Sequence, residues 1–328
     1  MKVLVTGATS LLARRTAEAL LHRGDQVVVF QRHASPVETE QILGDIRDNQ
    51  RVVAAAAGCD AIIHAAAKVG VVGRWLDYHS INVDGTANVI AAARHQGVAR
   101  LIHVSTPSVA HAGHSLVGAL AEPAVTGRAN AMYAESKAIA ERLALTAADD
   151  SLAVVAIRPH LVWGPGDTQL VGRMVARAKA GWLALVGTGA ALIDTTYIDN
   201  AASALVAALD AAQPDARCIG RAYVIANGEP RPIRELVLGI CRAAGIDASP
   251  RRIPLRIALP AGSLAERLWS LKPGDDEPPL TRFLAEQLAT AHWFDPRPAR
   301  DDLGWLPTVS IDEGLRQLAD WFSDHGRA

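Results

Sequence analysis

Short β-branched runs alternate with Ala-rich segments of helical spacing through the first half of the chain. Helices that connect consecutive strands of one sheet make those strands parallel and cover both faces of the sheet. The alternation therefore predicts an α/β fold with a Rossmann-type, doubly wound parallel sheet. Strands are expected near residues 2–6, 26–30, 41–43, 60–64, 100–104 and 153–158, and helices near 11–23, 48–57, 80–96 and 131–147.

Beyond about residue 165 the alternation becomes looser, and from Pro230 onward helical segments are separated by prolines. This pattern predicts a smaller, mostly helical C-terminal lobe that binds substrate. The elements expected before it are a helix near 169–180, a strand near 192–198, a helix near 199–211 and a strand near 222–226. The predicted dinucleotide-binding domain spans 1–165 and about 190–228, and the predicted substrate lobe spans about 166–189 and 229–328.

The charge balance and the cysteines exclude several classes of protein. Thirty-three Lys and Arg against 34 Asp and Glu leave a formal charge of -1, so no global field attracts nucleic acid, and no nucleic-acid partner is expected. Cys59, Cys218 and Cys241 are far apart and outside CxxC spacing, which predicts neither disulfides nor a metal site. The absence of a signal-like segment and of a long apolar run predicts a cytoplasmic location.

The segment from Val3 to Ala13 runs from a buried strand through a turn of small residues into an amphipathic helix. Such a turn presents backbone N–H groups and the positive end of a helix to a pyrophosphate. Ser10 and Ala13 stand at the second and third glycine positions of the usual pattern, and the Ser10 hydroxyl can donate a hydrogen bond instead. We expect Gly7, Thr9, Ser10, Leu11 and Leu12 to contact the cofactor.

The second strand ends at Gln31-Arg32, where a dinucleotide fold meets the adenosine ribose. An acidic residue at this point would accept hydrogen bonds from the 2′-hydroxyl of NAD and repel a 2′-phosphate. No acid is present, and Arg32 offers a guanidinium, so NADP(H) is expected to be favoured over NAD(H).

Tyr133 and Lys137 lie one helical turn apart, after a strand that ends in Ser105-Thr106-Pro107-Ser108. A hydroxyl that polarises a carbonyl, a phenol that delivers a proton and a lysine that lowers the phenol's pKa make a complete acid–base set. Ser105, Thr106 and Ser108 all remain candidates for the hydroxyl.

With these motifs the chain resembles the extended short-chain dehydrogenase/reductases, in their 3β-hydroxysteroid dehydrogenase-like branch, over essentially its whole length. The resemblance implies that Tyr133, Lys137 and Thr106 are catalytic, with Ser105 as a neighbour able to share the role of Thr106. It also implies cofactor contacts beyond the turn, at Arg32, Asp45, Ile46, Ala65, Ala66, Ala67, Tyr133, Lys137, Pro159, Leu161 and Val162.

Further stretches resemble the ketoreductases of bacterial long-chain olefin biosynthesis, among them 66–70, 105–109, 197–202, 266–269 and 281–288. This likeness implies an NADPH-dependent reductase that converts a long-chain 2-alkyl-3-oxoalkanoic acid to the 2-alkyl-3-hydroxyalkanoic acid. A 3β-hydroxysteroid or sterol dehydrogenase is the alternative. A nucleotide-sugar epimerase and a non-catalytic NADP-sensing regulator fit less well, the regulator because the Tyr-Lys pair is present. Nucleotide-sugar 4,6-dehydratases are disfavoured because Pro107-Ser108 follows Thr106, where those enzymes carry two acids.

The expected partner is an apolar small molecule, either long-chain acyl or steroid-like. The stretch 255–269 mixes apolar and basic residues, and the resemblance allows a lid, a peripheral membrane contact or a contact with a pathway enzyme. Pro260 and Gly262 predict that this stretch does not form one long helix. Helices 80–96 and 131–147 are candidates for a homodimer contact, and His160 is a candidate contact for a substrate carboxylate.

Overall fold

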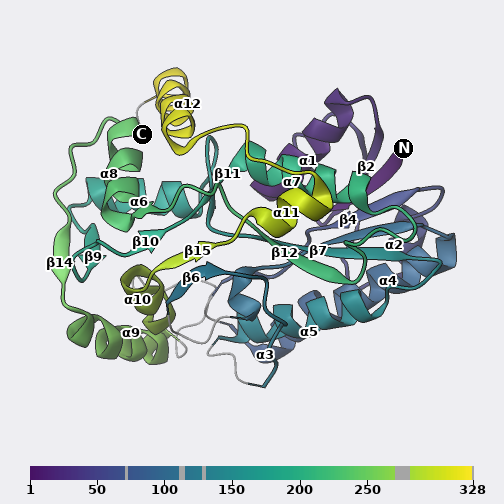
Figure 1. Cartoon of the computed structure of the whole chain (residues 1–328), viewed down its shortest axis with the longest axis horizontal. Coiled ribbons are helices and arrows are strands. Elements are labelled where there is room, and N and C mark those ends of the chain that lie inside the picture. The colour runs from purple at the N-terminus through teal and green to yellow at the C-terminus, as the bar shows by residue number, and fades with distance from the viewer. Residues whose placement is uncertain (71–72, 111–114, 128–130, 270–280, 327–328) are drawn as a thin grey trace.

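The computed structural model describes residues 1–70, 73–110, 115–127, 131–269 and 281–326. Its centre is a sheet of seven parallel strands in the order β12-β7-β5-β4-β1-β2-β3 (Figure 1). The order reverses beside β1, which places the carboxyl ends of β1 and β4 at the switch point where such folds bind ligands. The predicted doubly wound sheet is therefore confirmed. The strands are β1 Lys2–Thr6, β2 Gln26–Gln31, β3 Glu40–Leu43, β4 Ala61–His64, β5 Arg100–Val104, β7 Ala153–Pro159 and β12 Arg221–Ile225.

Two apolar layers cover the sheet, one on each face. On one face lie α1 (Leu11–His22), α7 (Ile198–Ala211) and α11 (Arg297–Leu303), and on the other lie α2 (Asn49–Ala55), α4 (Gly85–Gln96) and α5 (Met132–Thr146) (Figure 1). The predicted helix 80–96 is longer than expected at its start. It begins as α3 (Trp75–Tyr78), passes through a π-helical turn, η1 (His79–Asp84), and continues as α4.

The C-terminal lobe has an apolar core of its own, between α6 (Leu170–Lys179), α8 (Ile233–Ala243) and α12 (Ile311–Asp324). Two small sheets accompany this core, and the sequence pattern predicted only the part of them that falls in the strand expected near 192–198. A four-stranded sheet runs in the order β13-β10-β15-β6, and a two-stranded sheet pairs β14 with β9. Their bounds are β6 Leu116–Ala119, β9 Ala184–Val186, β10 Leu192–Ile193, β13 Arg231–Pro232, β14 Arg251–Ile253 and β15 His292–Phe294.

The strand predicted near 192–198 is divided into β10 and β11 (Thr196–Tyr197), which belong to different sheets. The break falls at Asp194, whose buried carboxylate accepts hydrogen bonds from the backbone N–H groups of Thr195, Gly228 and Glu229. β11 pairs with β8 (Val162–Trp163). Three elements pack across the predicted domain boundaries. β6 and β10 join a sheet with β13 and β15 of the predicted lobe, and α11 packs against α7 and β12.

Residues Leu255–Trp269 form one continuous helix, α9, so the prediction that Pro260 and Gly262 break it is wrong. Pro260 lacks the N–H that would bond the carbonyl of Arg256, but both residues are exposed, and water can satisfy that carbonyl. Gly262 is buried one turn after the buried Ala258, and these small residues suit the close packing of α9 against α10 (Arg282–Ala289). Within the described chain, no helix combines the length and the apolar character needed to cross a membrane.

Candidate active site

The turn after β1 folds as a phosphate-binding loop requires. Gly7 has φ +80°, and a Cβ at this position would lie 2.8 Å from Cα of Ala66, so a larger residue would push apart the ends of β1 and β4. Ser10 is the N-cap of α1, and its Oγ accepts a hydrogen bond from the N–H of Ala13 at 3.4 Å. Because Ser10 is exposed and its oxygen acts as an acceptor here, the hydroxyl hydrogen remains available to a ligand.

A cavity of about 250 Å³ opens beside this loop. Its walls include nine residues predicted from the sequence as cofactor contacts, namely Gly7, Thr9, Ser10, Arg32, Asp45, Ile46, Ala65, Ala66 and Ala67. The prediction missed five lining residues, Phe30, His33, Gly44, Lys68 and Ile81, and assigned no contact to Gln31, which also lines it. The cavity thus extends from the loop to the end of β2, where the pyrophosphate and the adenosine of a dinucleotide bind in this kind of sheet.

At the far end of the cavity Asp45 is held by Arg47, with Oδ2 2.6 Å from Nη2. Hydrogen bonding to Arg47, with a further contribution from Arg32, lowers the pKa of Asp45. Gln31 is buried, and its Nε2 donates to Oε1 of Gln41 at 3.0 Å, while its own Oε1 has no partner among the described residues. The cavity thus contains a buried acceptor without a partner, Oε1 of Gln31, and the tight turn at Gly7. Both features fit a bound dinucleotide.

Buried polar contacts fix the strand end that forms one wall of this cavity. Oγ1 of Thr6 accepts hydrogen bonds from the N–H groups of Ala65 and Ala66 and donates to Nδ1 of His64 at 2.8 Å. Nε2 of His64 lies 3.1 Å from Oγ1 of Thr86. Burial lowers the pKa of His64 to about 3, so the ring is neutral. In a neutral imidazole one ring nitrogen donates a hydrogen bond and the other accepts one.

Tyr133, at the start of α5, lies beside Thr106, as the sequence predicted for a proton donor and its hydroxyl partner. Desolvation raises the pKa of Tyr133 to about 12, and a hydrogen bond with Thr106 opposes this rise. Of the three candidate hydroxyls, Thr106 is therefore the one placed at the phenol. Ser108 lies 3.3 Å from Oγ1 of Thr106, while Oγ of Ser105 is buried without a partner in the described residues.

Lys137 is only 3% exposed, and its ammonium is directed to β5. Nζ donates to the carbonyl of Val104 at 2.6 Å and lies 3.5 Å from Nε2 of His103. Desolvation lowers the pKa of Lys137 to about 8, and the nearby Glu141 opposes this shift. In this structure a hydrogen bond with Thr106 favours the phenolate form of Tyr133, while the ammonium of Lys137 is engaged by the carbonyl of Val104.

Asn82, in the π-helical turn η1, is a site residue that the sequence analysis missed. Its side chain donates to the carbonyl of Lys68 at 3.0 Å and to Oγ of Ser136 at 2.9 Å, and it accepts from the N–H of Lys68 at 2.7 Å. It thereby connects the wall of the cofactor cavity to α5, between Tyr133 and Lys137. Asn82 stands one helical turn before Thr86, and both are polar residues on the buried side of the helix. A polar residue in such a position is the sequence feature that could have identified it.

Five other predicted cofactor contacts do not line the 250 Å³ cavity, namely Leu11 and Leu12 at the start of α1, Pro159 at the end of β7, Leu161 in the turn after it and Val162 at the start of β8. Leu161 has φ 42°, an uncommon backbone conformation for a residue other than glycine. His160 is buried, and its Nδ1 lies 2.7 Å from the carbonyl oxygen of Asp194, so this ring nitrogen is not open to a substrate carboxylate. No group of three or more candidate ligands for a metal occurs in the part of the chain that the structure describes.

Comparison with known proteins agrees with this geometry. Residues 4–256 match the model of the 3-beta hydroxysteroid dehydrogenase/isomerase family. The chain is 50% identical to the 2-alkyl-3-oxoalkanoate reductase of Stenotrophomonas maltophilia, over 97% of this chain and 98% of that protein. It is 38% identical to the 2-alkyl-3-oxoalkanoate reductase of Shewanella oneidensis, over 96% of this chain and 84% of that protein.

Among solved structures, the UDP-glucose 4-epimerase of Thermotoga maritima, in complex with UDP-glucose, superimposes with a TM-score of 0.74. The match covers 99% of both chains at 19% sequence identity. At this identity the likeness concerns the fold, and the substrate must be inferred from other observations.

Proposed function

The chain belongs to the 3-beta hydroxysteroid dehydrogenase/isomerase family, and we propose that the protein reduces a long-chain 2-alkyl-3-oxoalkanoate to the 2-alkyl-3-hydroxyalkanoate with NADPH. The observation that carries this proposal is the 50% identity to a 2-alkyl-3-oxoalkanoate reductase over nearly the whole of both chains, including the C-terminal lobe. The lobe matters because the cofactor motifs of the first half serve many substrates in this fold.

The nicotinamide cofactor supplies the hydride that reduces the 3-oxo carbon. Thr106 donates a hydrogen bond to the carbonyl oxygen, and Tyr133 delivers the proton to it. A phenol with a pKa of about 12 is protonated at neutral pH, which suits a proton donor in the reductive direction. Lys137 and the loop residues Gly7, Thr9 and Ser10 hold the cofactor, with Asn82 keeping the helix of Tyr133 against the cavity wall.

The preference for NADPH rests on the end of β2. Arg32 is exposed at the cavity and forms no ion pair with a described residue, so its guanidinium is available to a 2′-phosphate. No carboxylate occupies the position of Gln31 or Arg32, where an acid would repel that phosphate. The division into two domains and a homodimer contact through α4 and α5 remain predictions.

The test is NADPH oxidation by the purified protein with a series of 2-alkyl-3-oxo acids of increasing chain length, with a 3-ketosteroid run alongside. An apolar pocket gains about 0.8 kcal/mol per buried methylene, so kcat/KM should rise up to about fourfold per methylene until the pocket is filled. A flat response, or a preference for the steroid, would contradict the proposal and support a 3β-hydroxysteroid dehydrogenase, the alternative that the family model favours.

A further inference from the structure

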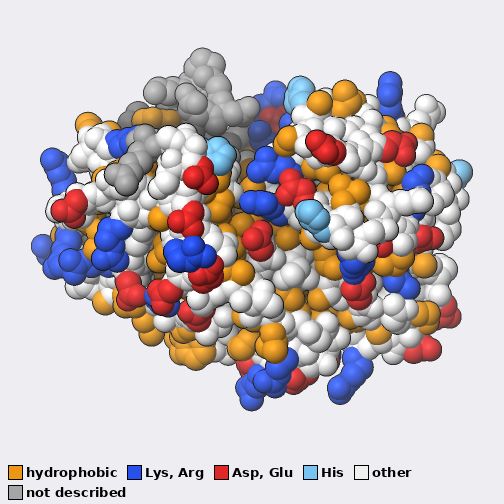
Figure 2. All heavy atoms as spheres, turned by 90° about the horizontal axis from the view of Figure 1, so that it is seen from above, with side chains coloured by type: hydrophobic (Ala, Val, Ile, Leu, Met, Phe, Trp, Pro, Cys, Tyr) orange, Lys and Arg blue, Asp and Glu red, His pale blue; other side chains and the backbone are white. Residues whose placement is uncertain are grey.

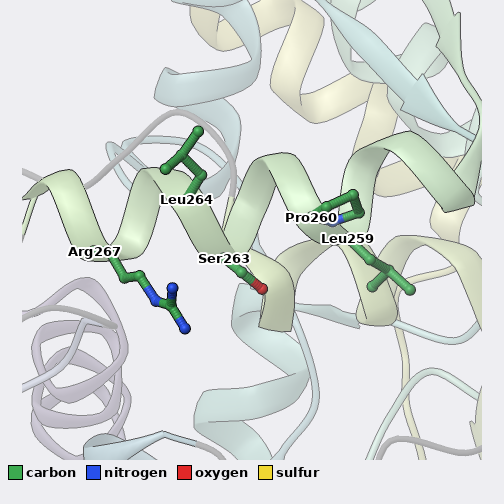
Figure 3. Close-up of a pocket in the computed structure, with 5 residues that line it drawn as sticks. All are labelled: Leu259, Pro260, Ser263, Leu264 and Arg267. Atoms are coloured by element: carbon green, nitrogen blue, oxygen red, sulfur yellow. The ribbon is translucent and has the colours of Figure 1, made fainter.

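Two lysine or arginine side chains of the described residues, Arg158 and Lys137, are buried, and they are stabilised in different ways. Other lysines and arginines project from the surface, as Figure 2 shows for the face seen from above and Figure 3 shows for Arg267, which extends away from α9. Arg158 is paired with the buried carboxylate of Glu141. Lys137 forms no ion pair with a described carboxylate, and its hydrogen-bonding neighbours are a carbonyl and an imidazole. A buried ammonium without a carboxylate depends on such groups to offset its desolvation.

The imidazole is that of His103, on β5. Nζ of Lys137 donates to the carbonyl of Val104 at 2.6 Å and lies 3.5 Å from Nε2 of His103. An ammonium has three N–H donors and no acceptor, so Nε2 is the acceptor in this contact. Desolvation, with the nearby Lys137 and His64, lowers the pKa of His103 well below its usual value, so the ring is neutral. Its one ring proton is therefore on Nδ1.

This tautomer leaves a buried donor of His103 unsatisfied. Nδ1 has no hydrogen-bond partner among the described residues, although the ring is fully buried. His64, which stands opposite His103 on β4 with its ring centroid 5.5 Å away, shows the contrast, because its two nitrogens contact the hydroxyls of Thr6 and Thr86. A buried N–H without a partner lowers stability and calls for an explanation. The explanation here is the lone pair that the other nitrogen presents to Lys137.

From these contacts we propose that His103 is a positioning residue for Lys137, whose Nε2 accepts a hydrogen bond that holds the ammonium against β5 and keeps it charged. The inference rests on the proposed function, in which Lys137 holds the cofactor. Without this acceptor, the carbonyl of Val104 would be the one remaining contact of the ammonium among the described residues. The neutral amine would then be favoured, and the pKa of Lys137, already lowered by burial to about 8, would fall further.

The other titratable groups around this ammonium do not replace His103. Glu141, one turn later on α5, favours the charged form, but its carboxylate is engaged by Arg158. Tyr133, one turn earlier, has a pKa of about 12, and His64 on β4 has a pKa of about 3, so both are neutral at pH 7. His103 is thus the side chain in direct contact with Nζ.

The experiment measures the affinity for NADPH by fluorescence between pH 6 and 9, without substrate, in the unmodified protein and in His103→Phe. The phenyl ring fills the volume of the imidazole but offers no acceptor. Loss of one hydrogen bond to the ammonium should lower the pKa of Lys137 by about one unit. Because the charged fraction at pH 8 would then fall from about a half to about a tenth, NADPH should bind about fivefold more weakly at pH 8 and less than about twofold more weakly at pH 6.

Two amide variants test the acceptor itself. In His103→Gln the amide oxygen can reach the position of Nε2, so the pH profile should return to that of the unmodified protein. In His103→Asn the shorter amide reaches only the position of Nδ1, so this variant should behave like His103→Phe. His95→Asn, at the exposed end of α4, controls for the loss of a histidine as such and should leave the profile unchanged.

A purely structural role of His103 would weaken NADPH binding equally at every pH. Such a uniform loss, an unchanged profile in His103→Phe, or a Gln variant that behaves like the Asn variant would each overturn the proposal. If His103→Phe does not fold, the comparison of Gln with Asn decides the question alone. Because the titration contains no oxo acid, failure of the reductase assignment would appear in turnover and not in this result.

Discussion

The half of the molecule around the seven-stranded sheet contains an ion pair that is buried at both ends, whereas the ion pairs of Arg231 and Arg316 in the C-terminal lobe are partly or largely exposed. Arg158 and Glu141 are each 1% exposed and joined by two hydrogen bonds, and Lys137 lies one turn before Glu141 on α5. In the lobe, Arg316 is 61% exposed where it meets Glu313. Buried charges cost desolvation energy that exposed pairs do not. Lys137 and the buried pair of Glu141 and Arg158 therefore lower the stability of the helix that carries the proposed catalytic residues.

The strongest test of this contrast is the removal of one partner from a pair in each half. Glu141→Ala would leave the Arg158 guanidinium buried without its carboxylate, and we expect a loss of about 3–5 kcal/mol in the free energy of unfolding. Glu313→Ala removes an exposed carboxylate that bonds Arg316 and Gln317, and a much smaller loss is expected because water solvates the partners that remain. Urea denaturation of both variants measures the difference, and similar losses would contradict the contrast.

The next test compares two tyrosines. Tyr133→Phe removes the proposed proton donor, and turnover should fall at least about a hundredfold with little change in cofactor affinity. Tyr197→Phe is the matched control away from the site, because its hydroxyl bonds Oε1 of Gln317 and burial likewise raises its pKa. Steady-state kinetics with a 2-alkyl-3-oxo acid gives the answer. Near-normal turnover in Tyr133→Phe would remove this residue from the mechanism.

A smaller effect is expected at the cofactor end of the same half. The double change Gln31→Asp and Arg32→Ala replaces a cation by an acid beside the adenosine ribose, and the kcat/KM ratio should shift toward NADH. One charge-assisted contact with phosphate is worth roughly 1.5–3 kcal/mol, which corresponds to a shift of about tenfold to a hundredfold. Arg316→Ala, in the lobe, should leave the ratio unchanged. An unmodified enzyme that already prefers NADH would contradict the assignment of Arg32.

The two halves also differ in how far the sequence predicts them. Around the sheet, strand and helix positions followed from local patterns, because buried parallel strands and the turn at Gly7 depend on residues that are adjacent in sequence. Beyond residue 165, local patterns were insufficient. β10 and β11 separate because Asp194 binds backbone groups of residues 228 and 229, and α9 persists through Pro260 because that residue faces water.

In the candidate site, too, the sequence predicted the residues that local motifs identify but not the contacts between distant segments. Spacing placed Tyr133 and Lys137 on one helix and Thr106 at a strand end, and the cavity collects most of the predicted cofactor residues. Contacts between distant segments were not predictable from spacing. Asn82 donates a hydrogen bond to Ser136, which is 54 positions away in the sequence. The ammonium of Lys137 donates to the carbonyl of Val104. No sequence motif predicts either contact.

The smallest expected effect concerns the stability cost of Lys137 itself. A shift of its pKa from 10.5 to about 8 means that folding disfavours the charged form by roughly 3 kcal/mol at pH values below 8. Lys137→Met shortens the unbranched side chain by one atom and removes the charge, but it leaves the carbonyl of Val104 without its donor, at a cost of about 1–3 kcal/mol. The variant should therefore be inactive yet about 1 kcal/mol more stable than the unmodified protein at pH 7.

The pH dependence of this gain identifies its origin. Between about pH 8 and 10.5 the folded protein has lost the Lys137 proton while the unfolded chain still binds it, so the stability of the unmodified protein rises with pH relative to Lys137→Met. The advantage of the variant should shrink over this range and vanish or reverse above it, whereas other groups that titrate there affect both proteins alike. Urea denaturation without cofactor at pH 7, 8, 9 and 10 measures the difference. A gain that is constant with pH would mean that packing, and not the buried ammonium, accounts for it.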